Sequence, residues 1–496
     1  MVLCACLAQV TVVLDTTIVS VALPDAQADL GFGDADRQWL VTAYTLAFGS
    51  LLLFGGRLSQ FLGPRVAFML GAAGFAVASL MGGLADSFGF LVAMRALQGA
   101  FAALLAPANL SLMNGAFPGS DGRARAFAIF GSVAGAGAAL GLILGGVLTE
   151  SWGWRWCLFV NVPIILVTLA IAIPALRSAA RRVAGRLLDD GLGLVLGTGS
   201  VFAVVFGFSR AQELGWRHPV TVILLGGGVM MAVAFVLRER LAAAPLVPLS
   251  LLQDHRRSTS YLSIALVGVA QMGSSLYLTY YLQQDLGYSP LRSGVAFLPL
   301  VGALVVAAVL STSIVVPRFG LVAAFIAGPI LQGLGFLWMS RLGTADAYVG
   351  ELLGPMLVIG LGFGMVMAPA MSSATYGVPP ENRGLASALA STSQQLGASL
   401  GVAFLSTLAA RVATERGAEL KADLLATLTS GAAGPATSPA AIALRDKAVA
   451  DATREAAVSG YAAGFLSLSF VRFGVAVLIA VMFAVAARRP AWVMAL

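Results

Sequence analysis

The stretch VTVVLDTTIVSVALP, residues 10–24, places one acid, Asp15, in the middle of an apolar run. The run starts at Val2 and has no charged leading region, so we expect a retained membrane helix and not a cleaved signal peptide. An apolar stretch of about 20 residues is long enough to cross the hydrocarbon core of a bilayer as a helix. Similar stretches recur along the whole chain, and they determine the fold class.

Composition agrees with this interpretation. The chain has 496 residues, of which 59% are hydrophobic and 11% charged, and its mean hydropathy is +0.90. A soluble domain carries about 25% charged residues, so we expect an all-α integral membrane protein and not a β-barrel, whose strands show only short alternation. The sequence predicts fourteen membrane helices, near residues 2–23, 38–59, 65–85, 88–115, 124–148, 156–176, 191–209, 219–237, 259–283, 291–315, 320–340, 349–371, 385–409 and 464–487.

Several classes of function are excluded by the scarcity of reactive side chains. The two lysines, Lys421 and Lys447, follow no phosphate-binding glycine loop, so ATP hydrolysis does not power the protein. The two histidines lie in short polar connections, so no histidine metal site is expected. Scattered acids in the connecting loops do not resemble the active site of a membrane-embedded transferase. We therefore expect no enzyme, no metal and no cofactor.

Arginine placement orients the chain. If the N-terminus is cytoplasmic, inner loops and the C-terminus hold 16 of the 30 basic residues, and short outer loops hold six. This bias is the positive-inside pattern of membrane proteins. It accounts for most of the net charge of +7, so we expect no nucleic-acid partner. The expected location is the inner (cytoplasmic) membrane, crossed many times, with both termini in the cytoplasm.

A faint internal repeat divides the chain. Residues 117–146 match 378–407 in pattern: a proline-containing loop, an arginine, and then a helix of small residues. Both loops face inward in the expected topology, as a parallel repeat about an axis along the membrane normal requires. We therefore expect an N-terminal bundle in 1–176, inserted helices with basic linkers in 177–258, and a C-terminal bundle in 259–496.

Segment 410–460 is alanine-rich and has charges of both signs. We expect helical pieces interrupted at GAAGPATSP, residues 431–439, on the outer side of the membrane. A solvated extracellular cap is the simpler role, and gating of a substrate path is the alternative.

Charges inside a membrane helix cost about 2.5–3.5 kcal/mol and mark candidate functional sites. Desolvation favours the protonated form of a carboxyl group such as Asp15, which makes it a candidate proton site. Arg95 and Gln98, one helical turn apart in LVAMRALQGAFAALL, are its expected partners. The alternative is a structural ion pair or a helix cap. Arg472 lies near a helix end and is expected to extend to the lipid headgroups.

Helix packing and substrate binding also have candidate residues. Gly137, Gly141 and Gly145 repeat every four residues and give one smooth face for close contact with a neighbouring helix. Polar and aromatic side chains in the expected spans could line a substrate cavity, although membrane-interface anchoring is an equal alternative. The candidates for substrate binding are Trp39, Tyr44, Asn109, Tyr277, Tyr280, Gln284 and Gln394.

At these residues the chain resembles the fourteen-helix drug:proton antiporter branch of the major facilitator superfamily. LDTTIVSVALP (14–24), GGRLSQFLGPR (55–65), RALQGAFAA (95–103) and GAGAALGLILGG (135–146) each look like a motif of that branch. The resemblance implies two pseudo-symmetric six-helix bundles plus two inserted helices. It implies that Asp15 couples protons, that Arg95 is its relay partner, and that residues of the second motif act in gating: Gly56, Arg57, Gln60, Gly63 and Arg65.

Three residues depart from the family pattern. Gln60 stands where the family usually has an aspartate, Leu142 replaces the proline of the fifth-helix motif, and Ser20 replaces an asparagine. In the family, the aspartate at the position of Gln60 belongs to an interaction that holds the outward-facing state, and Gln60 puts that interaction in question. Leu142 puts in question the helix bend that the family associates with antiport.

Together, these features predict proton-coupled export of amphipathic small molecules, with cations among the candidate substrates, by alternating access; drugs or antibiotics are the expected class. The expected partners are the small-molecule substrate, protons and the lipid bilayer, with the chain acting as a monomer. Two alternatives remain open: export of an endogenous lipid, siderophore or secondary metabolite, and a non-transporting sensor or structural paralogue.

Overall fold

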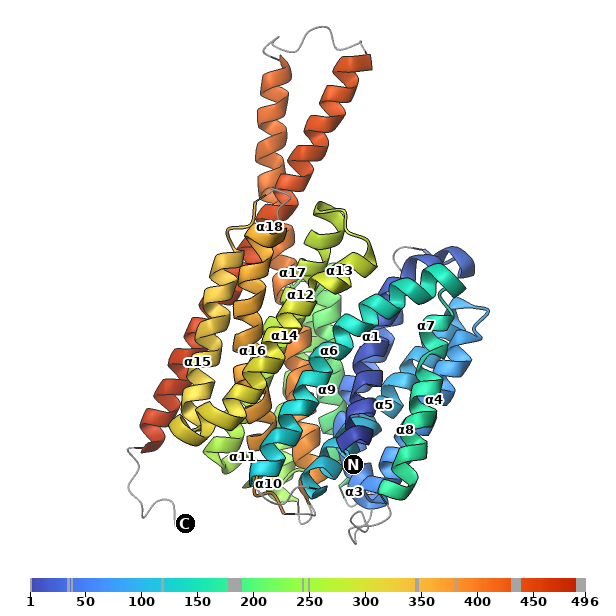
Figure 1. The fold of residues 1–496 in the computed structure, drawn as a ribbon, viewed down its shortest axis with the longest axis vertical. Helices are drawn as coiled ribbons and strands as arrows, with labels where there is room; N and C mark the ends of the chain where they lie inside the picture. The colour runs from blue at the N-terminus through green and yellow to red at the C-terminus, as the bar shows by residue number, and fades with distance from the viewer. Residues whose placement is uncertain are drawn as a thin grey trace.

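Long helices standing side by side make up the fold (Figure 1). The computed structural model describes residues 2–33, 36, 39–116, 120–176, 190–242, 245–248, 250–343, 348–379, 382–429 and 439–487. Within these residues, twelve helical stretches are long and apolar enough to cross a membrane.

The N-terminal half packs as one bundle. Helix α1 packs along α6, α3 packs along α5, and α4 lies between α5 and α8. Apolar side chains dominate every contact face, because nearly every residue of these helices is hydrophobic or small. The helices are α1 (Val2–Leu30), α3 (Trp39–Leu62), α4 (Pro64–Gly83), α5 (Phe88–Ala116), α6 (Ser120–Trp152), α7 (Trp156–Phe159) and α8 (Asn161–Ala175).

Two inserted helices follow. Helices α9 (Gly191–Leu214) and α10 (Pro219–Leu241) pack against each other, and α9 also contacts α3 of the first half and α17 of the second. Asp190 begins α9 by accepting a hydrogen bond from the backbone of Gly193, and Pro219 occupies the first turn of α10. The inserted pair therefore touches both halves of the molecule.

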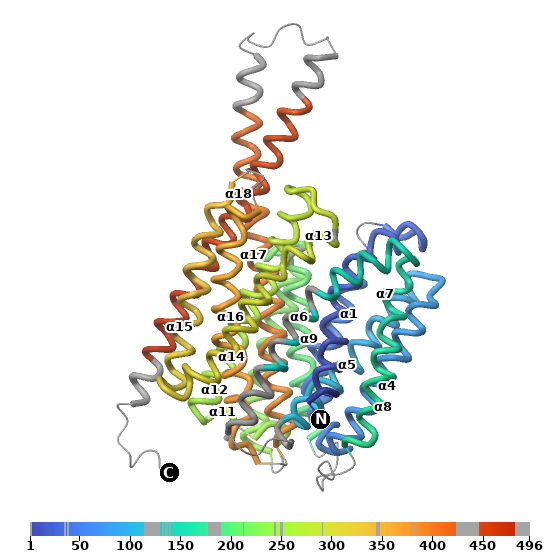
Figure 2. Tube along the Cα trace, viewed as in Figure 1, coloured from blue at the N-terminus to red at the C-terminus, as the bar shows by residue number. Residues whose placement is uncertain are grey.

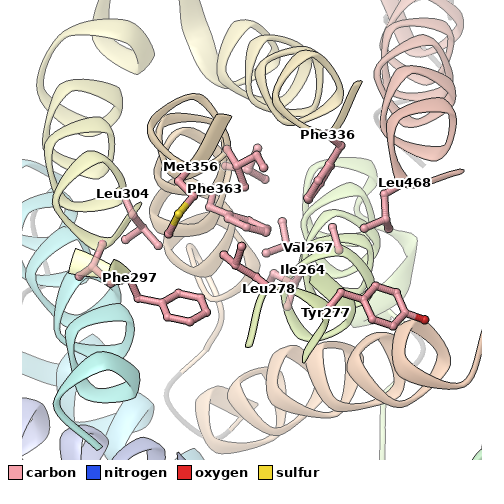
Figure 3. Close-up of a cluster of buried hydrophobic side chains, with 14 of the residues drawn as sticks. Ile264, Val267, Tyr277, Leu278, Phe297, Leu304, Phe336, Met356, Phe363 and Leu468 are labelled. Carbon is pink, nitrogen blue, oxygen red and sulfur yellow. The ribbon is translucent and has the colours of Figure 1, made fainter. Parts of the chain in front are cut away.

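The C-terminal half packs around a large apolar core (Figure 3). Phe336, Met356 and Phe363 meet Ile264 and Leu278 in this core. Its elements are α11 (Ser250–Gln253), α12 (His255–Tyr280), η1 (Tyr281–Asp285), α13 (Pro290–Ala296), α14 (Leu298–Leu310), η2 (Ser311–Val315), α15 (Val316–Met339), η3 (Tyr348–Leu352), α16 (Leu353–Ala374), α17 (Arg383–Thr429) and α18 (Pro439–Ala487).

The twelve candidate spans agree with the predicted all-α membrane fold. The prediction of fourteen helices differs from these twelve spans at two places. One candidate span, Leu291–Met339, contains Gly320 in a non-helical conformation with φ of 80°, which divides it where the sequence predicts two helices. Helix α6 contributes only its last part, Leu140–Trp152, to the apolar stretches that could be assessed.

Helices α17 and α18 extend beyond the rest of the bundle as a hairpin, away from the end where α1 begins (Figure 2). Arg416 of α17 donates to Glu455 of α18 at 2.8 Å, which joins the two helices above the bundle. The helices expected in segment 410–460 are therefore present, as extensions of α17 and α18 that project from the bundle. Residues 430–438, which include most of GAAGPATSP, lie outside the described residues.

The expectation for Arg472 is wrong. Its side chain has no exposed surface, so it does not extend to the lipid headgroups. It lies on the buried stripe of α18 with Phe465, Leu468 and Val475, and this stripe faces the apolar core of the C-terminal half. The position of Arg472 near the end of the predicted helix suggested that its side chain could reach water. The helix is oriented so that this side chain points into the protein instead.

Candidate functional site

Asp15 lies in the middle of α1 and has no exposed surface. Its Oδ2 accepts a hydrogen bond from Arg95 Nη1 at 2.5 Å. Its Oδ1 accepts from Gln98 Nε2 at 3.2 Å and from Asn161 Nδ2 at 2.7 Å. An ionised carboxylate only accepts hydrogen bonds, so this set of three donors suits the charged form of Asp15. The expected contact of Asp15 with Arg95 and Gln98 is present.

Arg95 is held on several sides by α3 and α5. Its Nε donates to the Leu40 carbonyl at 3.1 Å, and its Nη1 donates also to Gln98 Oε1 at 2.9 Å. The Tyr44 ring lies under the guanidinium, 4.6 Å from ring centroid to Cζ, in a cation–π contact. Nη2 is buried and has no hydrogen-bond partner among the described residues. The arginine is therefore fixed in position but keeps one donor free.

Two further polar residues complete the cluster, and the sequence did not single them out. Ser79 Oγ of α4 accepts from Gln98 at 2.6 Å and from Asn161 Nδ2 at 3.5 Å. Asn161 begins α8 and binds Asp15 directly. Asn161 could have been found as a costly amide in an otherwise apolar run, whereas Ser79 lies among small residues that give no such signal.

The cluster joins α1, α3, α4, α5 and α8. Breaking a buried ion pair by removing one partner costs about 3–5 kcal/mol, because the remaining charge stays out of water. A proton added to Asp15 would have a similar local consequence, since it removes the negative charge that faces Arg95. One carboxyl group therefore joins α1 to partners on α5 and α8.

An apolar layer lies between this cluster and the end of the bundle from which the hairpin projects. A cavity about the size of one water molecule borders Arg95, and the other lining residues are Val19, Ala22, Leu23, Ala26, Leu40, Leu91, Trp154, Cys157 and Leu158. Beyond it, Asp29 accepts from Trp154 Nε1 at 3.0 Å and pairs with Arg155. On this side, apolar side chains and then an ion pair separate Asp15 from the surface.

The predicted glycine face of α6 packs against α1, the helix that carries Asp15. A Cβ placed on Gly141 would lie 2.9 Å from the Leu14 carbonyl oxygen and would collide with Thr17. A Cβ on Gly145 would lie 3.2 Å from the Ile18 side chain, and one on Gly137 would be in ordinary contact with Val13 at 3.4 Å. Helix α6 runs without interruption through Leu142, where the family pattern has a proline. Because these glycines have no side chains, the backbones of α6 and α1 can approach closely.

The two halves touch near the membrane face where α1 begins. Gly56 of α3 lies against Gly384 and Ala388 of α17, so that a Cβ on Gly56 would be 2.6 Å from the Ala388 Cβ. Gln60 is also buried beside Gly384, and its Oε1 accepts from Arg57 Nη1 at 3.3 Å. Gln60 thus keeps a contact with the neighbouring arginine although it carries no charge.

The remaining residues of this loop shape the turn between α3 and α4. Gly63 has φ of 85°, a conformation that favours glycine, and Arg65 lies half-buried in the first turn of α4. Near the opposite face, Gly294 of α13 packs against Ile143 of α6, with 3.2 Å between a Cβ on Gly294 and the Ile143 nitrogen. The halves are therefore in contact near both membrane faces.

The structure does not gather the seven candidate substrate residues at one place. Tyr44 belongs to the Arg95 cluster, and Asn109 is buried with its Nδ2 donating to the Ala5 carbonyl at 2.9 Å. Trp39 packs against Phe206 of α9. Tyr277 packs with Tyr461 and Phe465 inside the C-terminal half, Gln394 is half-buried on α17, and Tyr280 and Gln284 are exposed.

Many membrane-crossing helices arranged as two halves, one of which encloses an ion pair, define a multi-pass membrane protein. Residues 5–402 match the Major Facilitator Superfamily. The chain belongs to this family, and it is therefore a membrane protein that binds small-molecule substrates.

Known relatives cover most of the chain. The puromycin resistance protein pur8 of Streptomyces alboniger is 44% identical over 81% of this chain and 80% of its own length. The cephamycin export protein CmcT of Amycolatopsis lactamdurans is 40% identical over 82% of this chain and 83% of its own. The human organic anion transporter MFSD10 (TETRAN) shares the fold, with a TM-score of 0.59, 15% identity, and coverage of 96% of this chain and 98% of that one.

Proposed function

We propose that the protein exports amphipathic, cationic small molecules, drugs or antibiotics among them, in exchange for protons. The observation that carries this proposal is the Asp15 carboxylate, which is fully buried and bound by Arg95, Gln98 and Asn161. An amide side chain can donate to an ionised carboxyl group or accept from a protonated one, so Gln98 and Asn161 can bind both forms of Asp15. The relatives named for antibiotic resistance and export support efflux as the direction of transport.

Proton uptake by Asp15 is the coupling step of this proposal. When the carboxyl group is protonated, Arg95 loses its counter-charge and becomes an unpaired buried cation, which is unfavourable. Water or a displaced helix must then solvate it, so the contacts of α1 with α5 and α8 change. Inward movement of the proton supplies work, about 2.3 kcal/mol per charge for each 100 mV of membrane potential.

Alternating access would use the contacts between the two halves. The contact of α3 with α17 at Gly56 and Ala388 closes one face, and the contact of α6 with α13 at Ile143 and Gly294 closes the other. The glycine face of α6 allows α1 to shift when Asp15 changes its charge. We propose that both termini lie in the cytoplasm, on the arginine bias of the loops that the sequence shows. The proposal also takes the chain to act as a monomer in the cytoplasmic membrane.

Export of an endogenous secondary metabolite is a second candidate. Relatives named as a tetracenomycin C resistance and export protein of Streptomyces glaucescens and a probable actinorhodin transporter of Streptomyces coelicolor favour it over lipid or siderophore export. A sensor that binds ligand without moving it is the alternative of another class.

The test is proton-gradient-driven efflux of a fluorescent cationic dye from proteoliposomes. Wild type, Asp15→Asn and Asp25→Asn are compared, since Asp25 is an exposed acid on the same helix and serves as a matched control. Flux that collapses only in Asp15→Asn supports the proposal, and equal flux in all three contradicts it. Dye binding without flux in the wild type favours the sensor.

A further inference from the structure

A second pair of acids lies away from Asp15, at the ends of the inserted helices on the side where α1 begins (Figure 1). Asp190 stands at the start of α9 and Glu239 in the last turn of α10, and each is 4% exposed. Neither residue takes part in the contacts between the two halves described above. Buried polar atoms normally have hydrogen-bond partners, so each carboxyl oxygen of these two acids is expected to have one.

Two of the four carboxyl oxygens have donors. Asp190 Oδ1 accepts from the Gly193 backbone at 3.0 Å and pairs with Arg238 at 3.2 Å. Glu239 Oε2 accepts from the Val247 backbone nitrogen at 2.9 Å. The linker that follows α10 is thereby tied to the end of that helix.

The other two oxygens, Asp190 Oδ2 and Glu239 Oε1, are buried and have no donor in the part of the chain that the structure describes. They face the same point, since a Cβ on Gly193 would collide with both, and the two carboxyl groups are within hydrogen-bond reach of each other. Two ionised carboxylates cannot share such a contact, because both only accept hydrogen bonds. One proton between them satisfies both oxygens.

The charge balance leads to the same conclusion. With one shared proton the pair carries one negative charge, which Arg238 neutralises; without it, one charge is left over in a nearly dry site. Arg238 is the cation that pairs with Asp190, and Arg240 follows it at the end of α10. Asp254, His255 and Arg257 lie further along the chain at the start of α12, where Asp254 caps the helix and pairs with Arg257. Arginines stay protonated in proteins, so within the group formed by Asp190, Glu239 and Arg238 the two acids are the residues that can titrate.

We propose that Asp190 and Glu239 bind one shared proton, as a second protonation site separate from Asp15, and that this proton fastens the linker 245–248 to the end of α10. The linker places Leu246 and Val247 in a cluster with Val378 and Leu385, just before and within the first turn of α17. Ala388, one turn further along α17, contacts Gly56 of the other half. Loss of the proton therefore loosens a segment that supports the contact between the halves.

Amide hydrogen exchange at Val247 tests the proposal without any transport assay, so its result does not depend on the proposed export function. The full chain is measured in detergent between about pH 5 and about pH 9, with correction for the intrinsic exchange rate. In the wild type, exchange at Val247 rises about tenfold or more as the pH increases and the shared proton leaves.

Three variants separate the proton from the fold. In Glu239→Gln and in Asp190→Asn an amide N–H takes the place of the shared proton, so Val247 stays protected at every pH. In Glu239→Ala the acceptor is lost, so Val247 exchanges fast at every pH. Asp254→Asn, a helix-capping acid at the start of α12, is the matched control and should keep the wild-type dependence.

Two results would overturn the proposal. One is wild-type protection at Val247 that is the same across the pH range. The other is Glu239→Gln behaving like Glu239→Ala. Infrared spectra give a direct readout, since the carboxylic acid C=O band of the pair should be absent in Glu239→Gln and Asp190→Asn and present in Asp254→Asn.

Discussion

Among the described residues, each half of the molecule has one arginine with almost no exposed surface, Arg95 and Arg472, and the surroundings of the two differ. Arg95 in the N-terminal half binds Asp15, Gln98 and the Leu40 carbonyl and lies over the Tyr44 ring. Arg472 in the C-terminal half has no exposed surface, and none of its three guanidinium nitrogens has a hydrogen-bond partner among the described residues. Gln332 of α15 is also buried in that half, and neither of its amide atoms has a hydrogen-bond partner in the described part of the chain.

The difference indicates a division of roles. The first half encloses a complete donor and acceptor network around one group that can change its charge. The second half holds a cation that has no hydrogen-bond partner in the part of the chain that the structure describes. Arginine does not deprotonate in proteins, so the second half has a fixed charge where the first has a variable one.

The largest effect on stability is expected from a substitution that breaks the hydrogen-bond network of the first half. Asp15→Leu leaves Arg95 as an unpaired buried cation and should reduce the free energy of unfolding by about 3–5 kcal/mol. The double variant Asp15→Leu/Arg95→Met removes both charges and should recover most of that loss. Denaturation of the purified variants in detergent measures both values. Equal instability of the single and double variants would show that the ion pair is not the cause.

The same reasoning predicts a gain in stability, and not a loss, when the buried arginine of the second half is replaced. Arg472→Leu removes an uncompensated charge from an apolar core and should increase stability by about 1–4 kcal/mol, by analogy with buried ionic groups replaced by apolar ones. Arg95→Leu, measured beside it by thermal unfolding, should decrease stability. If Arg472→Leu were also destabilising, the guanidinium would have a partner, and the contrast between the halves would fail.

A smaller effect is expected where helices approach closely in both halves. Gly141→Ala drives a methyl group toward the Leu14 carbonyl in the first half, and Gly401→Ala drives one toward Val269 in the second. Each should cost about 1–3 kcal/mol of stability. Gly226 of α10 has no neighbouring atom within 4 Å, so Gly226→Ala should instead stabilise the helix by about 0.5–1 kcal/mol. Equal responses at all three positions would rule out close packing as the reason for the glycines.

The smallest effect concerns the projecting hairpin. Arg411 and Glu415 form an ion pair at 2.8 Å one turn apart on α17, with side chains 75% and 59% exposed. Solvent screens such a pair, so Glu415→Gln should leave the melting temperature and dye efflux unchanged. A clear loss of efflux would instead point to a gating role for the segment 410–460.

Sequence reasoning found the Asp15 and Arg95 pair because charges are rare in apolar helices and each needs a partner. It could not find Ser79, whose role depends on the rotation of α4 against α5. It misjudged Arg472, because distance along the chain from a helix end does not reveal which way a side chain points. The candidate substrate residues illustrate the same limit: polarity selected them, but only packing decides whether they meet in one cavity.

The family resemblance supplied what periodicity alone could not, namely the arrangement of the helices and the role of the loop between the second and third predicted helices. The acid pair of Asp190 and Glu239 lay beyond both approaches. The two residues are 49 positions apart in the sequence, and nothing in the helix pattern predicts that the ends of α9 and α10 meet there.

The hairpin of α17 and α18 has a consequence for measuring motion. Both helices continue unbroken from the C-terminal half, and Arg416 with Glu455 holds them together outside it. From Arg411 to Lys421, α17 advances about 15 Å at 1.5 Å per residue, so a rotation of this half displaces Lys421 more than any point within the bundle. A fluorophore or spin label at this exposed position would therefore move over a longer distance than a label within the bundle. It would make small angular changes of the C-terminal half measurable as distances.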